Sequence, residues 1–250
     1  MTEIIILAAG KGKRMRGSVS KVLTPILDRP MISYLLDSIK EFDRDIKPII
    51  VVSPDNKEEI KEALKAYNFR TATQLQIQGT GQAVLSAKDE VSKLAKKILV
   101  LNGDHPFIPA SSISSLLSKH NGLLSIMSVK LKDFSSWRQN FYHWGRLFRD
   151  SEDNLEKIVE FKDASEEEKK ILEVNPAIFC FNSQWLWENI SKLKNNNKQG
   201  EYYLTDLVKM VFDSKEKIIT VPIRPEYGMG INSQEELEIV KKNILNKLIK

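Results

Sequence analysis

A loop rich in glycine and positive charge follows the first apolar segment of the chain. Residues 4–7 read IIIL, residues 8–14 continue as AAGKGKR, and Lys21 lies shortly after. Glycine lets the main chain approach a ligand closely, main-chain N–H groups can surround phosphate oxygens, and lysine and arginine neutralise phosphate charge. The loop therefore indicates phosphate binding, and an exposed lysine-rich loop is the alternative. It matches neither the P-loop pattern GxxxxGK[ST] nor the three glycines of a dinucleotide fingerprint.

A carboxylate follows a second apolar segment. Residues 98–101 read ILVL and lead into Asn102-Gly103-Asp104. A side chain at the carboxyl end of a parallel strand faces the crevice where α/β sheets bind ligands, and its oxygens suit a hard cation such as Mg²⁺. A turn-forming aspartate is the alternative. The three histidines are scattered and Cys180 lies alone in an apolar segment, so we expect no histidine or cysteine metal site.

Alternating strand and helix patterns are expected to position these loops. Apolar runs predict strands at 4–7, 49–52 and 98–101, and helical periodicity predicts helices at 31–41, 57–66, 82–94 and 111–119. Repeated strand–helix–strand units form parallel sheets with helices on both faces. We therefore expect an α/β fold with a Rossmann-like, mostly parallel twisted sheet.

The second half of the chain has a different pattern. It predicts strands at 123–129, 145–149, 155–160, 178–181 and 218–221, helices at 185–192 and 203–212, a polar connector at 195–200, and a final helix from residue 235. We interpret these strands as a β-rich elaboration on the substrate side of the same sheet. The expected division is one domain over 1–232, followed by a C-terminal helical segment over 233–250.

Composition limits the classes of function. The chain has 250 residues, 42% hydrophobic residues, 28% charged residues and a net charge of +5. Because its lysines are dispersed among glutamates, we expect anionic small molecules rather than nucleic acid as partners. No apolar run approaches the roughly 20 residues of a membrane span, and no leader pattern opens the sequence, so a cytoplasmic location without membrane insertion is expected.

The glycine-rich loop also carries a family resemblance. LAAGKGKRMRGSVSKVL resembles LxAGxGxRMxxxxPKxL, the signature of the sugar-phosphate nucleotidyltransferases. Further segments resemble one branch of that family, in order, over about residues 3–240: QIQGTGQAV, LVLNGDHPFI, WGRLFRD, IVEFKDAS, EVNPAIF, NNNKQGEYYLTDLV and GINSQEEL. That branch is the uridylyltransferase half of the bifunctional N-acetylglucosamine-1-phosphate uridylyltransferase/glucosamine-1-phosphate acetyltransferases.

The resemblance implies a reaction and the residues that perform it. UTP and N-acetylglucosamine 1-phosphate would give UDP-N-acetylglucosamine and pyrophosphate, with Mg²⁺ as cofactor. It implies that Arg14 and Lys21 stabilise charge on the phosphates and that Asp104 and Asn232 bind the metal. It further implies nucleotide binding by Leu7, Ala8, Ala9, Gly10, Lys11, Gly12, Gln74, Gly79, Thr80, Asn102 and Gly103, and sugar binding by Gly145, Glu160, Asn175, Tyr203 and Thr205.

Three positions depart from the family pattern. Ser20 replaces the proline before Lys21, Ile77 replaces a residue that is often polar beside the base, and Pro176-Ala177 follows Asn175 where Thr-Gly is usual. Three alternatives therefore stay open. The acceptor could be another sugar 1-phosphate, the nucleotide donor could be dTTP or CTP, or the chain could be a non-catalytic domain that binds nucleotide sugars. Because no hexapeptide repeats follow, we expect neither acetyl transfer nor the β-helix trimer interface.

Overall fold

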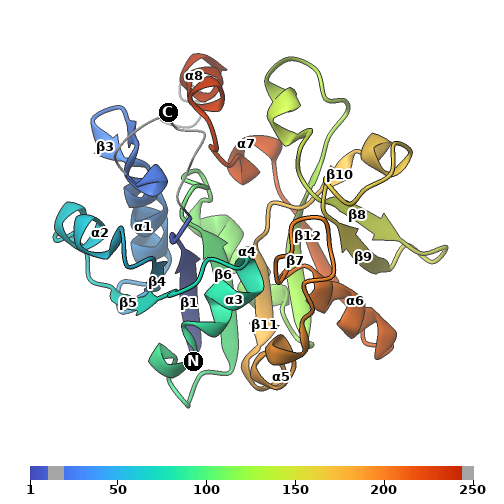
Figure 1. Cartoon of the computed structure of the whole chain (residues 1–250), viewed down its shortest axis with the longest axis horizontal. Helices are drawn as coiled ribbons and strands as arrows, with labels where there is room; N and C mark the ends of the chain where they lie inside the picture. The colour runs from blue at the N-terminus through green and yellow to red at the C-terminus, as the bar shows by residue number, and fades with distance from the viewer. Residues whose placement is uncertain (11–19, 244–250) are drawn as a thin grey trace.

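The computed structural model describes residues 1–10 and 20–243, and within them a ten-stranded sheet forms the centre of the molecule (Figure 1). Its strands are β1 (Thr2–Leu7), β4 (Ile49–Val52), β5 (Arg70–Thr73), β6 (Lys97–Asn102), β7 (Leu124–Lys130), β8 (Arg146–Arg149), β9 (Leu155–Val159), β10 (Glu173–Val174), β11 (Phe179–Asn182) and β12 (Ile219–Pro222). The strand order is β5-β4-β1-β6-β11-β7-β10-β8-β9, and β12 pairs with β7. A separate hairpin joins β2 (Pro25–Ile26) and β3 (Arg29–Pro30).

The first four strands of this order are parallel. β1 pairs with β4 on one side and with β6 on the other, so the chain passes to the opposite side of β1 between β5 and β6. Open α/β sheets bind ligands at such a reversal, beyond the carboxyl ends of the strands. β11 then runs antiparallel to both β6 and β7, and β8, β9 and β10 extend the sheet with antiparallel pairs.

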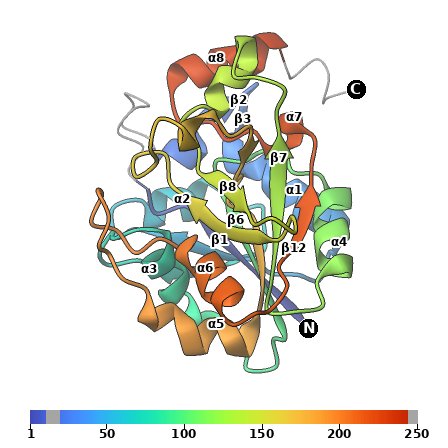
Figure 2. The same cartoon turned by 90° about the vertical axis from the view of Figure 1, so that its right-hand side faces the viewer.

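Helices cover both faces of the sheet (Figures 1 and 2). The α-helices are α1 (Met31–Phe42), α2 (Lys57–Ala63), α3 (Thr80–Leu85), α4 (Ala110–Lys119), α5 (Ser183–Asn189), α6 (Asp206–Asp213), α7 (Pro225–Gly228) and α8 (Gln234–Asn243). Short 3₁₀ turns are η2 (Lys21–Leu23), η3 (Lys88–Glu90), η4 (Ser136–Phe141), η5 (Glu168–Lys170) and η6 (Ile190–Lys192). Ile4 and Ile6 of β1 pack with α1, α2 and α4, whereas Ile5 packs with α3, α5 and α6. Alternate side chains of one strand thus enter two separate cores.

The predicted Rossmann-like, mostly parallel α/β fold with a β-rich elaboration is confirmed, but several helix boundaries were wrong, among them the end of α2 at Ala63 rather than at residue 66. The helix predicted over 82–94 ends at Leu85, and a 3₁₀ turn follows at η3. Ser86 donates from its hydroxyl to the carbonyl of Gln82, a local bond that competes with further helical bonds. The helix predicted from residue 203 begins at Asp206, because the main chain of Tyr202 pairs with the segment before α3.

Several short elements, the hairpin of β2 and β3 among them, had no recognisable pattern in the sequence. β10 has two residues and α7 has four, so neither is long enough to show a periodicity. Leu237 and Val240 of α8 pack in one apolar cluster with Phe141 of η4. The division of the chain at residue 232 stays a prediction. In the part of the chain that the structure describes, no helix is long and apolar enough to cross a membrane.

Candidate active site

The carboxyl ends of β1, β5 and β6 meet at one edge of the sheet and carry most of the expected site residues. Leu7 ends β1, Gln74 follows β5, and Asn102 ends β6. Sheet-like hydrogen bonds continue for one residue beyond β1 and β5. Ala8 N–H donates to the carbonyl of Val51, and Gln74 N–H donates to the carbonyl of Val52. The strand ends therefore fix where the first side chains of each loop lie.

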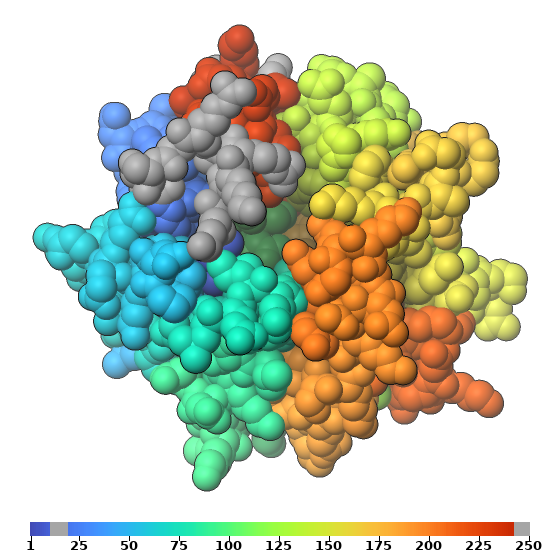
Figure 3. Space-filling view, viewed as in Figure 1, coloured from blue at the N-terminus to red at the C-terminus, as the bar shows by residue number. Residues whose placement is uncertain are grey.

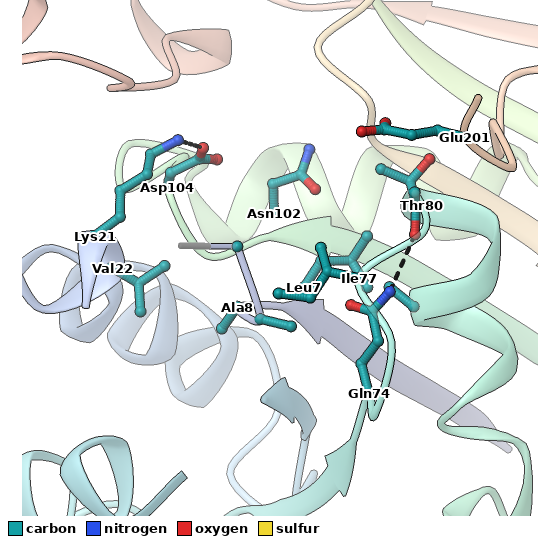
Figure 4. A pocket seen from close by; sticks show the side chains of 14 residues that line it. Leu7, Ala8, Lys21, Val22, Gln74, Ile77, Thr80, Asn102, Asp104 and Glu201 are labelled. Atoms are coloured by element: carbon teal, nitrogen blue, oxygen red, sulfur yellow. Dashed lines mark hydrogen bonds and ion pairs between the residues drawn. The ribbon is translucent and has the colours of Figure 1, made fainter. Parts of the chain in front are cut away.

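Two hollows lie beside each other at this edge. The first, of about 240 Å³, lies over β1 and β6; the second, of about 310 Å³, lies toward β8 and β9. Both are lined by Thr80, Asn102 and Asp104, so they form one continuous cleft. Figure 3 shows this face hollowed between the teal surface and the orange surface, and Figure 4 shows the first hollow from close by.

The start of the glycine-rich loop is held by a buried asparagine. Asn56 donates from its amide to the carbonyl of Ala8 (2.9 Å) and to the hydroxyl of Ser20 (3.1 Å). Ser20 N–H donates to Glu59 (3.1 Å). Ser20, where the family pattern has proline, therefore ties the loop to α2 through its hydroxyl. Ala8, Ala9 and Gly10 line the first hollow, whereas Lys11, Gly12 and Arg14 lie outside the described residues.

Lys21 joins the two residues expected to bind metal. Its ammonium contacts Asp104 Oδ2 and lies 2.6 Å from Asn232 Oδ1 (Figure 4 shows the Asp104 contact). The side chains of Lys21 and Asp104 are only 13% and 18% exposed. Of the described residues that line the two hollows, Lys21 is the only lysine or arginine. The side-chain oxygens of Asp104 and Asn232, which are far apart in the sequence, thus converge on the Lys21 ammonium.

Main-chain bonds and a helix cap hold Asn232 beside Asp104. Ile231 N–H donates to the Asp104 carbonyl (3.0 Å), and Asn232 N–H donates to the Glu236 carboxylate. The hydroxyl of Ser233 accepts a hydrogen bond from the main-chain N–H of Glu236 (3.2 Å). Ser233 therefore caps the start of α8. The first turn of α8 therefore positions Asn232 at the cleft.

The surroundings of Asp104 favour its charged form. Burial by itself would raise its pKa, but the Lys21 ammonium and His105 outweigh burial and hold the pKa well below its usual value. Among the described residues, no three His, Cys, Asp or Glu side chains group as metal ligands. One carboxylate and one amide oxygen fit Mg²⁺, because Mg²⁺ commonly takes one or two protein oxygens and completes its shell with phosphates and water.

The loop before α3 forms one wall of the first hollow. Gly79 has φ +107°, and a Cβ there would lie 2.7 Å from the Tyr202 carbonyl oxygen, so the turn requires glycine. Gln74 donates from its amide to the Gly79 carbonyl (3.3 Å) and to Gln82 Oε1. These bonds leave the Gln74 carbonyl oxygen as the group able to accept from a ligand. Ile77 also lines this hollow and is 43% exposed.

Glu160 is a half-buried carboxylate that lines the second hollow, toward β8 and β9. It accepts from the Thr205 hydroxyl (3.0 Å). Burial raises its pKa, nearby Asp206 and Asp163 raise it further, and the Thr205 bond opposes this shift. Asn175 N–H donates to the Gly145 carbonyl (2.9 Å), so three of the expected sugar residues, Gly145, Glu160 and Asn175, line one wall.

Three of the expected residues do not line the cleft. Tyr203 accepts from Gln199 (2.7 Å) and donates to Asp163 (3.2 Å), and Thr205 donates its hydroxyl to Glu160 (3.0 Å). Gly103 donates its N–H to the Leu7 carbonyl (2.9 Å) and joins the ends of β6 and β1. All three are buried, and none is among the residues that line the two hollows, so their roles in binding stay predictions.

The motif comparison missed several residues that line the cleft. They are His105, Asn140, His143, Trp144, Glu201 and Glu236. Asn140, His143 and Trp144 belong to an aromatic segment, residues 134–144, which packs around the fully buried Arg146. Arg146 donates to the Tyr142 carbonyl (2.7 Å) and to that of Trp144. The aromatic run directly before Gly145 was the signal available in the sequence.

The fold and the cleft define a nucleotidyltransferase with the nucleotide-diphospho-sugar transferase fold. Residues 4–199 match the MobA-like NTP transferase domain, and the chain belongs to that family. It is 38% identical over 96% of its length to the bifunctional protein GlmU of Caldicellulosiruptor saccharolyticus and 37% identical over 98% to that of Clostridium kluyveri. It covers 51% and 53% of those proteins, about half of their length.

Solved structures share the fold at low sequence identity. The UDP-glucose pyrophosphorylase complexed with UDP-glucose superimposes with a TM-score of 0.75 at 17% identity, covering 99% of both chains. A glucose-1-phosphate thymidylyltransferase from Bacillus anthracis gives 0.74 at 18% identity, covering 97% of this chain and 94% of that one. The inositol-1-phosphate CTP transferase of T. maritima gives 0.74 at 15%, covering 99% and 98%.

Proposed function

We propose that the chain transfers UMP from UTP to N-acetylglucosamine 1-phosphate in a Mg²⁺-dependent reaction. The main supporting observation is the convergence of Lys21, Asp104 and Asn232 where the two hollows join. A phosphate donor in one hollow and a phosphate acceptor in the other would meet at this cluster. The relationship to the GlmU proteins supports the choice of UTP and of an N-acetylhexosamine phosphate.

The proposed chemistry needs no protein nucleophile. An oxygen of the sugar phosphate forms a bond to the α-phosphorus of UTP, the bond from that phosphorus to the bridging oxygen breaks, and pyrophosphate leaves with the electron pair. The attacking phosphate is already an anion, so positioning and charge neutralisation provide the catalysis. Asp104 and Asn232 would hold Mg²⁺, which supplies positive charge at the phosphates. Lys21 neutralises developing charge, together with Arg14.

The two hollows would separate nucleotide from sugar. In the first hollow, the free carbonyl oxygen of Gln74 would accept the N3–H of uracil, and Ala8 and Ala9 leave room for a flat base. In the second hollow, Glu160 would accept hydrogen bonds from sugar hydroxyls. The side-chain NH₂ group of Asn175 would donate a hydrogen bond to the sugar. The side-chain carbonyl oxygen of Asn175, Oδ1, already accepts a hydrogen bond from the main-chain N–H of Ala177 (2.8 Å).

A different sugar 1-phosphate is the second candidate, and the sugar hollow supplies its reason. Ala177 adopts φ +54°, a left-handed conformation that favours glycine, and Pro176 beside it lines the hollow. The aromatic segment 134–144 adds side chains at the same place. Thymine or cytosine in place of uracil is a further alternative, because apolar Ile77 adds no base-specific hydrogen bond.

A substrate panel tests the proposal. Pyrophosphate release is measured for UTP, dTTP and CTP, each with N-acetylglucosamine 1-phosphate, glucose 1-phosphate and galactose 1-phosphate, with and without Mg²⁺. We expect the highest kcat/KM for UTP with N-acetylglucosamine 1-phosphate. Turnover only with another pair would contradict the substrate assignment. Binding of UDP-N-acetylglucosamine without turnover of any pair would favour a regulatory nucleotide-sugar-binding domain.

A further inference from the structure

His105 connects the two chain segments that carry Asp104 and Asn232. Its side chain is buried, its ring Nδ1 lies 2.7 Å from Asp104 Oδ1, and its ring packs on the main chain of Gly230, two residues before Asn232. The ring of Trp144 lies 5.3 Å away between centroids. His105 therefore contacts both segments of the cluster, at Asp104 and at Gly230.

The bond to Asp104 fixes which ring nitrogen carries hydrogen. An ionised carboxylate can only accept, so Nδ1 must be the donor in this pair. The other nitrogen, Nε2, is buried and is one of two buried side-chain polar atoms in the described residues that have no hydrogen-bond partner. A buried polar nitrogen without a partner costs stability, whether it would donate or accept. An apolar ring would fill the same space without that cost, so stability alone does not explain a histidine here.

Gly230 is shaped to receive this ring. A Cβ at Gly230 would lie 2.7 Å from Cε1 and 2.9 Å from Nε2 of His105, closer than any side chain tolerates. The next residue, Ile231, donates its N–H to the Asp104 carbonyl. The ring and this main-chain bond together set how far Asn232 stands from Asp104.

We propose that His105 is a positioning residue for the divalent cation: by occupying Oδ1 of Asp104 and seating Gly230, it directs Asp104 Oδ2 and Asn232 Oδ1 at one point. The same two oxygens meet the Lys21 ammonium in this structure. The inference rests on the proposed Mg²⁺ dependence. Outer partners that orient metal ligands are typically worth about 10–100-fold in metal affinity.

Mn²⁺ affinity tests this role without relying on turnover. Binding of Mn²⁺ is measured by electron paramagnetic resonance in the presence of UTP, with a melting curve for every variant. His105→Phe keeps a ring but removes the donor, His105→Asn keeps a donor near the position of Nδ1, and Gly230→Ala displaces the ring. His120→Asn is the control, because buried His120 bonds Ser125 (2.9 Å) away from the cleft.

We expect His105→Phe and Gly230→Ala each to weaken Mn²⁺ binding by about 10–100-fold. The double variant, His105→Phe with Gly230→Ala, should lose no more Mn²⁺ affinity than the weaker-binding single variant. Both changes remove the bond from the His105 ring to Asp104, so their effects should not add. His105→Asn should recover part of the affinity, and His120→Asn should bind as the unchanged protein does. The melting temperature of His105→Phe should change little, since relief of the unpaired Nε2 offsets the lost bond.

Two results would overturn the inference, and they differ from each other. If the unchanged protein binds Mn²⁺ with UTP and both single variants bind it equally well, His105 does not position the ligands, and the proposed metal site stands. If the unchanged protein binds no Mn²⁺ with UTP, the metal site of the proposed function fails together with the role of His105. Gly230→Ala decides the question if His105→Phe does not fold.

Discussion

Replacement of Lys21 by methionine probes the centre of the cluster. Methionine keeps much of the side-chain length but removes the charge that meets Asp104 and Asn232. Loss of one preorganised donor to developing charge costs about 10²–10³ in turnover, or roughly 2.7–4 kcal/mol in the transition state. Since Lys21 is the only described cation lining the cleft, we expect a fall in kcat within that range.

The same change should lower stability in a pH-dependent way. The pKa of Asp104 is below its unfolded value, so its contribution to the free energy of unfolding is present above about pH 4 and is lost as pH falls through the folded value. Removal of one partner of a buried pair costs about 3–5 kcal/mol. We expect about 3 kcal/mol at pH 7, because His105 still bonds Asp104, and a smaller loss near pH 3.

Two assays check these values against a matched control. Pyrophosphate release with UTP, N-acetylglucosamine 1-phosphate and Mg²⁺ gives kcat, and urea unfolding followed by circular dichroism at pH 3, 5 and 7 gives the free energy of unfolding. Lys65→Met is the control, because Lys65 is 74% exposed and pairs with Glu62 at the surface, in the turn that follows α2. An equal loss of stability at pH 3 and pH 7, or a fall in kcat no larger than that of the control, would refute the reasoning.

Three further predictions concern the metal, the base and the sugar. Asp104→Asn should abolish Mg²⁺-dependent turnover while UTP still binds, as isothermal titration in EDTA would report; unchanged turnover would remove Asp104 from the metal site. Gln74→Ala should raise the KM for UTP and reduce its preference over CTP, measured as a ratio of kcat/KM values, and an unchanged ratio would exclude base reading by Gln74. Because the pKa of Glu160 is raised, the KM for the sugar phosphate should increase as pH falls through a value above that of an ordinary glutamate. Thr205→Val removes a bond that opposes the shift, so this increase should begin at higher pH; identical KM profiles would argue against the role of Glu160.

Local patterns made much of the fold predictable. The strands near residues 4, 49 and 98 are continuous apolar runs because both of their faces are buried, and such runs are visible without any partner. The errors fell where a local pattern competes with tertiary contacts. Tyr203 has an apolar body at a helix-compatible spacing, but the pairing of Tyr202 with the segment before α3 delays α6 to Asp206. Two-residue β10 exists only through its partners β7 and β8.

The sequence by itself determined the strand β1 and the family to which its motifs point, and it predicts that the loop after β1 binds phosphate. Only the tertiary structure decided that Lys21 contacts Asp104 and Asn232, which lie 83 and 211 positions away, and that Tyr203 bonds Asp163 rather than lining the two hollows. It also decided that His105 fits against Gly230. The physical reason is that a motif depends on neighbours along the chain, whereas a cluster depends on the order of strands and on the helix cap that fixes Asn232.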